Sequence, residues 1–355
     1  MKTTDFEFNT DATFIPSDPL ELRGKVRDSG RMIVLDRSTD AIVHSVFSTI
    51  HDYFRPGDLL VLNDSYIMAN SLWFKRGDER VHVSLYGHEP DGTYIVLMQP
   101  EQQSEAVGLT LTSINDDRLT CTLLEPMPNQ LWKAKFEPLE QLVPTLDQFG
   151  HMFDDTIEFD QAHWRTKPEA YRSVYAKKPG SLDIPSAGLH FSTDLLTQIA
   201  SKGVEIAYIT LHVGTTEILA VRHISEEEIE DHKVKPEYFE VGDEAAAKIN
   251  RAKAEGRRIF AVGTTVMRTL ESLLVNKERK TTVQAKTGWT NLYIYPGFEF
   301  KVVDVLLTNL HQPRSSHIVL TAAFASKDFV MRSYDEMIEK GGYEFDMFGD
   351  SMLII

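Results

Sequence analysis

The hydrophobic pattern changes its period along the chain. Near the N-terminus, short apolar runs predict buried strands at Arg31–Asp36 and Asp58–Asn63, with apolar residues at helical spacing between them. Residues 71–137 instead carry short alternating segments, separated by turn-forming pairs such as Asp91-Gly92. From about Tyr171 onward, strand and helix patterns alternate. The chain is therefore expected to be a mixed α/β protein with a smaller antiparallel β domain inserted into it.

This β-rich segment divides the chain into parts. We expect the inserted β-rich domain to span residues 65–154, because no helical pattern interrupts its short strands convincingly. Residues 1–64 and 155–355 then form one discontinuous α/β domain, which we expect to be catalytic. A chain of 355 residues is long enough for two domains, or for one large core with an insertion.

Local signals in the second half predict where individual elements begin. Ser192 is expected to be the N-cap of a helix, and Ser225 with Glu228 is expected to form a capping box. Residues 300–308 are expected to form one long buried strand, and a helix is expected from about Ser316.

Composition narrows the class of protein. Hydrophobic residues make up 42% of the chain and charged residues 25%, as in ordinary globular proteins. The formal net charge of -16 argues against tight, sequence-independent RNA binding, although a local basic patch would still allow an RNA substrate. Cys121 is the only cysteine, so no intramolecular disulfide can form. Because no apolar segment resembles a signal peptide or a membrane span, we expect a cytoplasmic protein without a membrane partner.

Four segments place Gly, Ser, Thr, His or Asn where a strand ends or a helix begins. They are residues 184–191, 210–216, 261–265 and 308–316. Ligands bind at such junctions in α/β folds because helix N-termini present free N–H groups and a positive dipole end. Small residues also let a ligand approach the backbone closely. We therefore predict that the four junctions meet in one cleft.

Two of these junctions contain histidines that also have a structural explanation. His190 fits either a proton-transfer residue or a hydrogen-bonded histidine in a turn, and His212 within a strand fits core packing as well as chemistry. The histidines show neither His-x-x-x-His spacing nor clustering with paired carboxylates, so no metal site is predicted. The sequence also contains no Gly-x-Ser-x-Gly elbow, Rossmann fingerprint or P-loop.

The other two junctions combine hydroxyl, amide and cationic groups. Thr264-Thr265 with Arg268 fits a carboxylate pocket at a helix N-terminus, or else a capped helix with an Arg268–Glu271 surface pair. Asn309 and His311 follow a very apolar strand, and packing alone explains such a concentration of polar groups poorly. This last junction favours a functional interpretation.

Taken together, these junctions resemble one enzyme family, the S-adenosylmethionine:tRNA ribosyltransferase-isomerases of queuosine biosynthesis. The matching stretches appear in family order over nearly the whole chain. They are Arg55–Asp64, Tyr171–Ala176 with Pro185–Phe191, Thr210–Gly214, Ala261–Thr265 with Arg268–Glu271, Tyr295–Gly297 with Phe300–Lys301, Thr308–Ser316, and Gly349–Asp350 with Met352–Ile355.

The resemblance implies both a fold and a reaction. The fold would be an α/β domain with a barrel-like sheet and flanking helices, interrupted by the smaller β domain. The enzyme would transfer and isomerise the ribosyl part of S-adenosylmethionine, its co-substrate, onto the aminomethyl group of a 7-deazaguanine base in tRNA. Epoxyqueuosine-tRNA would form, and adenine and methionine would be released. No metal is required, because the sulfonium already activates its neighbouring carbon, and we expect a monomer.

This chemistry suggests roles for the junction residues. It needs a base near the sulfonium carbon, donors toward adenine and a clamp for the methionine carboxylate. The candidates for proton transfer are His190, His212 and His311. Thr264, Thr265 and Arg268 are candidates for the carboxylate clamp. The other residues expected to bind S-adenosylmethionine are Asn63, Asp64, Ser186, Gly188, Gly214, Gly263, Asn309, Arg314, Ser315 and Ser316.

The chain also departs from the family pattern where tRNA contacts would be expected. The family usually continues Thr-Arg-Val-x-x-Ala-Arg-Leu where this chain has Ser65–Leu72, so both arginines are absent. A lysine-rich family segment is replaced by Gln99–Glu105, Gly-Thr-Phe becomes Thr215–Ile218, and Met-His-x-Glu becomes Val234–Glu237. Cationic residues that would hold tRNA phosphates are thus replaced by neutral or acidic ones.

These departures leave alternatives open. The same cleavage of S-adenosylmethionine would also serve a small-molecule acceptor. A third hypothesis is a binding protein that keeps the fold without catalysis, but four intact polar junctions argue against it.

Overall fold

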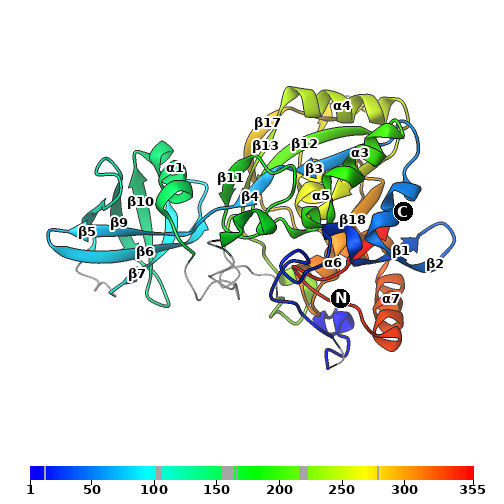
Figure 1. The fold of residues 1–355 in the computed structure, drawn as a ribbon, viewed down its shortest axis with the longest axis horizontal. Helices are drawn as coiled ribbons and strands as arrows, with labels where there is room; N and C mark the ends of the chain where they lie inside the picture. The colour runs from blue at the N-terminus through cyan, green and yellow to red at the C-terminus, as the bar shows by residue number, and fades with distance from the viewer. Residues whose placement is uncertain (12, 101–105, 153–163, 165, 216–222, 278–279) are drawn as a thin grey trace.

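The computed structural model divides the chain into a closed barrel and a larger α/β part (Figure 1). It describes residues 1–11, 13–100, 106–152, 164, 166–215, 223–277 and 280–355. Three features of the sequence interpretation lie outside the described residues: residues 101–105, residues 216–218, and the expected domain boundary between residues 154 and 155. The position of the domain boundaries therefore stays a prediction.

The larger part is built on a nine-stranded sheet. Its strands are ordered β17-β13-β12-β3-β14-β18-β19-β1-β2. Strands β12, β3, β14 and β18 are parallel neighbours, so their carboxyl ends lie at the same edge of the sheet. The bounds are β1 Arg31–Asp36, β2 Ala41–Val46, β3 Leu59–Asn63, β12 Glu205–His212, β13 Glu237–Val241, β14 Ile259–Val262, β17 Lys286–Thr290, β18 Val305–Asn309 and β19 Ser351–Ile354.

Both faces of this sheet are buried, which explains the continuous apolar runs of its central strands. In β3, Leu59 and Val61 enter one core cluster, whereas Leu60 and Leu62 enter another. Helices α4, α5, α6 and α7 cover the first face, and α3 with the 3-10 helix η3 covers the second. Their bounds are η3 Phe47–Tyr53, α3 Thr193–Ser201, α4 Asp243–Ala254, α5 Gly263–Ser272, α6 Ser316–Ala325 and α7 Lys327–Lys340.

The β-rich segment closes into an antiparallel barrel with the strand order β10-β7-β6-β5-β8-β9. Alternate side chains, among them Phe74, Val83 and the buried Cys121, fill its interior. Helix α1, Leu139–Phe149, packs Leu142 and Leu146 against the same core. The strands are β5 Ser71–Arg76, β6 Glu79–His88, β7 Tyr94–Gln99, β8 Thr110–Ser113, β9 Thr120–Pro126 and β10 Leu131–Glu137.

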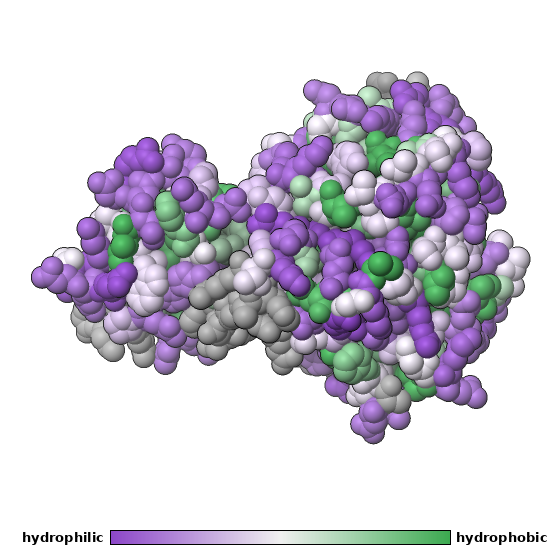
Figure 2. All heavy atoms as spheres, viewed as in Figure 1, coloured by the Kyte–Doolittle hydropathy of each residue, from purple (hydrophilic) through white to green (hydrophobic). Residues whose placement is uncertain are grey.

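The barrel contacts the α/β part through β6 and a short two-stranded sheet. This sheet pairs β4, Ser65–Ile67, with β11, Lys178–Ser181. At the end of β6, the backbone N–H of His88 donates to the carbonyl of Gly214, which follows β12. On the face drawn in Figure 2, both parts present a mainly hydrophilic surface with small, scattered hydrophobic patches.

The expected mixed α/β fold with an antiparallel β insertion is confirmed, while several local predictions need correction. The helix expected after the first strand is the 3-10 helix η3, and strand β2 precedes it. The capping box is wrong, because the Ser225 hydroxyl bonds Glu226 and only a single 3-10 turn, η7 Ile229–Asp231, follows. The N-cap at Ser192 is confirmed, since its side chain accepts a hydrogen bond from the Leu195 N–H.

The strand expected over residues 300–308 starts only at Val305, and a buried carboxylate explains the difference. The Glu271 side chain accepts hydrogen bonds from the backbone N–H groups of Lys301, Val302 and Val303, at 2.9–3.0 Å. These N–H groups are therefore satisfied without a neighbouring strand. Glu271 does not form the surface pair with Arg268 that the sequence also allowed.

Glu271→Ala should lower the free energy of unfolding by about 3 kcal/mol, because it leaves buried N–H groups without an acceptor. Urea denaturation monitored by circular dichroism measures this difference. Glu255→Ala is the matched control, since it removes an exposed ion pair with Arg257 that contributes at most about 1 kcal/mol. Equal losses in the two variants would contradict this role of Glu271.

Candidate functional site

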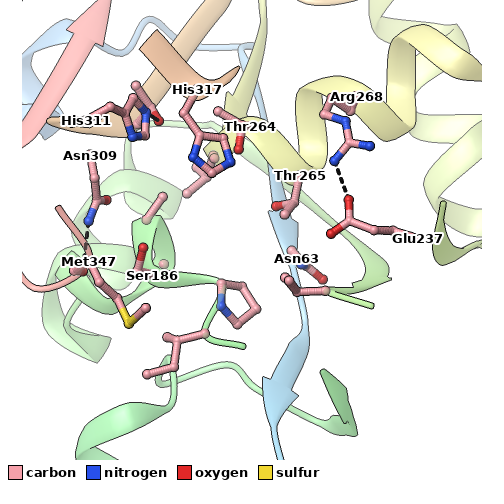
Figure 3. Close-up of a pocket in the computed structure, with 18 of the residues that line it drawn as sticks. Asn63, Ser186, Glu237, Thr264, Thr265, Arg268, Asn309, His311, His317 and Met347 are labelled. Atoms are coloured by element: carbon pink, nitrogen blue, oxygen red, sulfur yellow. Dashed lines mark hydrogen bonds and ion pairs between the residues drawn. The ribbon is translucent and has the colours of Figure 1, made fainter. Parts of the chain in front are cut away.

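The four polar junctions border one pocket at the carboxyl edge of the large sheet (Figure 3). The empty space in the pocket and its open mouth amounts to about 1020 Å³, part of which is open solvent. The first junction contributes η6, Ser186–His190, and the second contributes Val213 and Thr215 after β12. The third is the start of α5, and the fourth runs from the end of β18 into α6.

The pocket includes many, but not all, of the residues expected from the sequence. Those that line it are Asn63, Ser186, Gly188, Gly263, Thr264, Thr265, Arg268, Asn309, His311 and Ser316. Those outside its wall are Asp64, His190, His212, Gly214, Arg314 and Ser315. Polar lining residues that the sequence interpretation did not select are Tyr175, Thr215, Lys235, Glu237, Thr308, His317 and Asp346.

His190 lies directly behind the pocket wall. It is 4% exposed, stacks on Phe47 with ring centroids 5.0 Å apart, and its Nε2 lies 3.3 Å from Oδ1 of Asn309. The Asn309 amide in turn donates to the carbonyls of Asp346 and Met347. His190 is therefore placed to orient the amide of Asn309, which does line the pocket.

His212 packs on another part of the molecule. Its Nδ1 lies 2.7 Å from the hydroxyl of Ser65, its ring stacks on Tyr238, and a Cβ added at Gly180 in β11 would clash with the ring at 2.7 Å. Burial lowers the pKa of His212 to about 4, so the imidazole is neutral near pH 7. These contacts give His212 a position between the sheet and the segment that leads to the barrel.

The four other residues outside the wall have structural contacts. Asp64 accepts a hydrogen bond from the Thr210 hydroxyl, and Ser315 caps α6 by accepting from the Ile318 N–H. Arg314 forms an ion pair with Glu7, and the Gly214 carbonyl accepts a hydrogen bond from the backbone N–H of His88 in the barrel.

Two imidazoles occupy one end of the pocket (Figure 3). The His311 ring lies 5.0 Å from the His317 ring, centroid to centroid, and its Nε2 lies 2.9 Å from the Thr308 hydroxyl. The backbone N–H of His311 donates to the buried Tyr334 hydroxyl, which fixes the position of this loop. His317 stands in the first turn of α6, one residue beyond the junction that the sequence marked.

An ion pair lies at the opposite end. Arg268 on α5 binds the Glu237 carboxylate through Nη1, and its Nε donates to the carbonyl of Leu292 at 2.9 Å. Both side chains are largely buried. The sequence interpretation did not select Glu237 as a site residue. It treated the Val234–Glu237 segment only as a departure from the family pattern.

The N-terminus of α5 lies between these two ends. Gly263 adopts a φ of +87°, and an added Cβ would lie 3.3 Å from both Ala187 and the Thr265 hydroxyl. Glycine therefore allows this sharp turn from β14 into the helix. No side chain caps the helix, so the first N–H groups around Thr264 are available to an anion or to water.

Comparisons with known proteins identify the family of this chain. A family model described as "Queuosine biosynthesis protein" matches residues 3–354. The chain belongs to this family. The resemblance drawn from the sequence is therefore confirmed.

Members of the queuosine biosynthesis family also match at full length. Proteins of Desulfitobacterium hafniense and Thermotoga petrophila, both named S-adenosylmethionine:tRNA ribosyltransferase-isomerase, are 37% and 36% identical, each covering all of both chains. A crystal structure of S-adenosylmethionine tRNA ribosyltransferase from Thermotoga maritima is 32% identical, with a TM-score of 0.55. The match covers 99% of this chain and 100% of that one.

Two further observations describe this family member. In the described part of the chain, no helix has the length and apolar character of a membrane span. Among the described residues there is also no group of three or more His, Cys, Asp or Glu side chains that could hold a metal ion.

The buried His190 should make stability depend on pH. Burial lowers its pKa to about 4 from the ordinary 6.5, so unfolding takes up a proton between these values. The His190 contribution is thus present above pH 6.5 and lost as pH falls toward 4. His190→Gln should reduce the pH slope of the free energy of unfolding in this window by up to about 1.4 kcal/mol per pH unit.

Urea denaturation at several pH values measures this slope. Asp350 acts in the opposite direction, because burial raises its pKa to about 6 and its contribution is lost as pH rises. Comparing wild type with His190→Gln cancels that contribution, and His51→Gln, at a more exposed site, is the control. If the pH slope of the free energy of unfolding were the same in His190→Gln as in wild type, the lowered pKa of His190 would be contradicted.

Proposed function

We propose that this protein transfers and isomerises the ribosyl part of S-adenosylmethionine onto the 7-aminomethyl-7-deazaguanine base of tRNA. The products are epoxyqueuosine-tRNA, adenine and methionine. The observation that carries the proposal is the single pocket bordered by all four polar junctions. Full-length relatives named for this activity support the same reaction.

The two ends of the pocket suit the two ends of S-adenosylmethionine. His311 and His317 are placed for proton transfer near the sulfonium carbon and toward the adenine that leaves. Asn309 and Ser186, which lie beside them, orient the ribose or the base. The α5 N-terminus, with Thr264 and Thr265, offers N–H groups to the methionine carboxylate.

The acceptor enters from outside this pocket. Lys235 lines the pocket and is exposed, so its ammonium group is available to an RNA phosphate. Since several cationic residues of the family pattern are absent, we expect few phosphate contacts. The cytoplasmic location and the monomeric state stay predictions.

One assay separates the three hypotheses about the acceptor. The purified protein is incubated with S-adenosylmethionine, with and without tRNA that carries the 7-aminomethyl-7-deazaguanine base, and adenine and methionine are quantified by chromatography. Release that depends on this tRNA is the expected result. Release without tRNA would favour a small-molecule acceptor, and binding of S-adenosylmethionine without any release would indicate a non-catalytic protein.

A substitution series tests which histidine acts in the reaction. His311→Asn should lower kcat by roughly 100-fold or more, because a positioned acid or base contributes about that factor. His212→Asn, the matched control outside the pocket, should change kcat by less than about 3-fold, since it leaves the groups of the pocket in place. Steady-state kinetics of adenine release measures both, and thermal unfolding confirms that the variants are folded. Comparable kcat losses in the two variants would contradict the assignment of His311.

A further inference from the structure

The Glu237–Arg268 pair presents a carboxylate oxygen to the pocket. Figure 3 shows the Glu237 side chain reaching from β13 toward the cavity, between Thr265 and Asn63. Glu237 is only 8% exposed, and its Oε2 binds Nη1 of Arg268. Among the described residues, no group donates a hydrogen bond to its Oε1. A buried carboxylate with one oxygen held and the other facing a cavity is suited to a cationic ligand group.

Besides its expected part in a carboxylate clamp, Arg268 makes contacts that hold Glu237 in place. Its Nε is bound to the carbonyl of Leu292, and its Nη1 to Glu237, so the guanidinium is fixed from two sides. The pair with Glu237 partly compensates the charge of Arg268, while its Nη2 has no hydrogen-bond partner among the described residues. Arg268 is therefore a positioning residue that holds the Glu237 carboxylate in its orientation.

S-adenosylmethionine offers two cationic groups to such a carboxylate. The sulfonium has no hydrogen to donate, whereas the α-ammonium has three N–H donors. In the proposed reaction, the sulfonium carbon lies near the imidazoles of His311 and His317. These two rings occupy the opposite end of the pocket. The free N–H groups of α5, beside Glu237, meanwhile suit the neighbouring α-carboxylate.

We propose that Glu237, held by Arg268, binds the α-ammonium group of the methionyl part of S-adenosylmethionine. This assignment rests on the proposed function and orients the substrate. The amino acid end lies against α5 and β13, and the nucleoside lies toward Asn309 and His311.

The test compares two ligands on the intact protein without RNA. Isothermal titration calorimetry measures Kd for S-adenosylmethionine and for its analogue in which hydrogen replaces the α-amino group. Wild type should bind S-adenosylmethionine at least about 10-fold more tightly, because the analogue leaves the Glu237 oxygen without a donor. Glu237→Gln should reduce this ratio to within about 3-fold, since a neutral amide gives up the charge-assisted bond.

Glu240→Gln is the matched control. Glu240 lies on the same strand and binds Lys178 and Tyr238 away from the pocket, so its substitution should keep the wild-type ratio. Equal binding of both ligands by wild type would overturn the Glu237 assignment while leaving the proposed function intact. A wild-type ratio retained by Glu237→Gln, or an effect of that variant on tRNA binding alone, would overturn it as well. Failure of wild type to bind S-adenosylmethionine would overturn both proposals.

Discussion

The parallel pairing of β12, β3, β14 and β18 is the constraint on which the pocket depends. Because these strands run in one direction, the segments that follow them must leave the sheet at the same edge. Residues far apart in the chain, such as Asn63, Gly263 and Asn309, consequently reach one cavity. The central strand β3 is buried on both faces, so a shift of one residue in its pairing would exchange the side chains that each core receives.

Within this scaffold, buried polar contacts determine which groups face the cavity. His190 and two backbone carbonyls fix the amide of Asn309, and Tyr334 holds the backbone of His311. At the other end, Arg268 orients Glu237. Such positioning before a ligand binds lowers the reorganisation that catalysis would otherwise require.

The sequence predicts the scaffold better than the individual roles of its side chains. Strand and helix periods, together with Gly and Ser at junctions, indicate the α/β fold and the four segments that meet. They do not say whether a histidine in or after a strand faces the cavity, so His212 and His311 were both candidates for proton transfer, although only the junction of His311 favoured a functional interpretation. Nor do they single out Glu237 or His317, because neither residue stands at one of the small-residue turns that drew attention to the site.

Charged and irregular segments were the least predictable parts of the fold. The strand expected from residue 300 was shortened by Glu271, a long-range partner that local periodicity does not reveal. Here a tertiary contact overrides the local pattern.

The hydrogen bond between His88 of the barrel and the Gly214 carbonyl has a mechanical consequence. The segment it holds, Val213–Thr215, is also part of the pocket wall. A displacement of the barrel that kept this hydrogen bond would therefore also displace the segment that contains Thr215. If a macromolecule bound the barrel and displaced this segment, it would change the affinity of the pocket for a small ligand, and by linkage the small ligand would change the affinity for the macromolecule by the same factor.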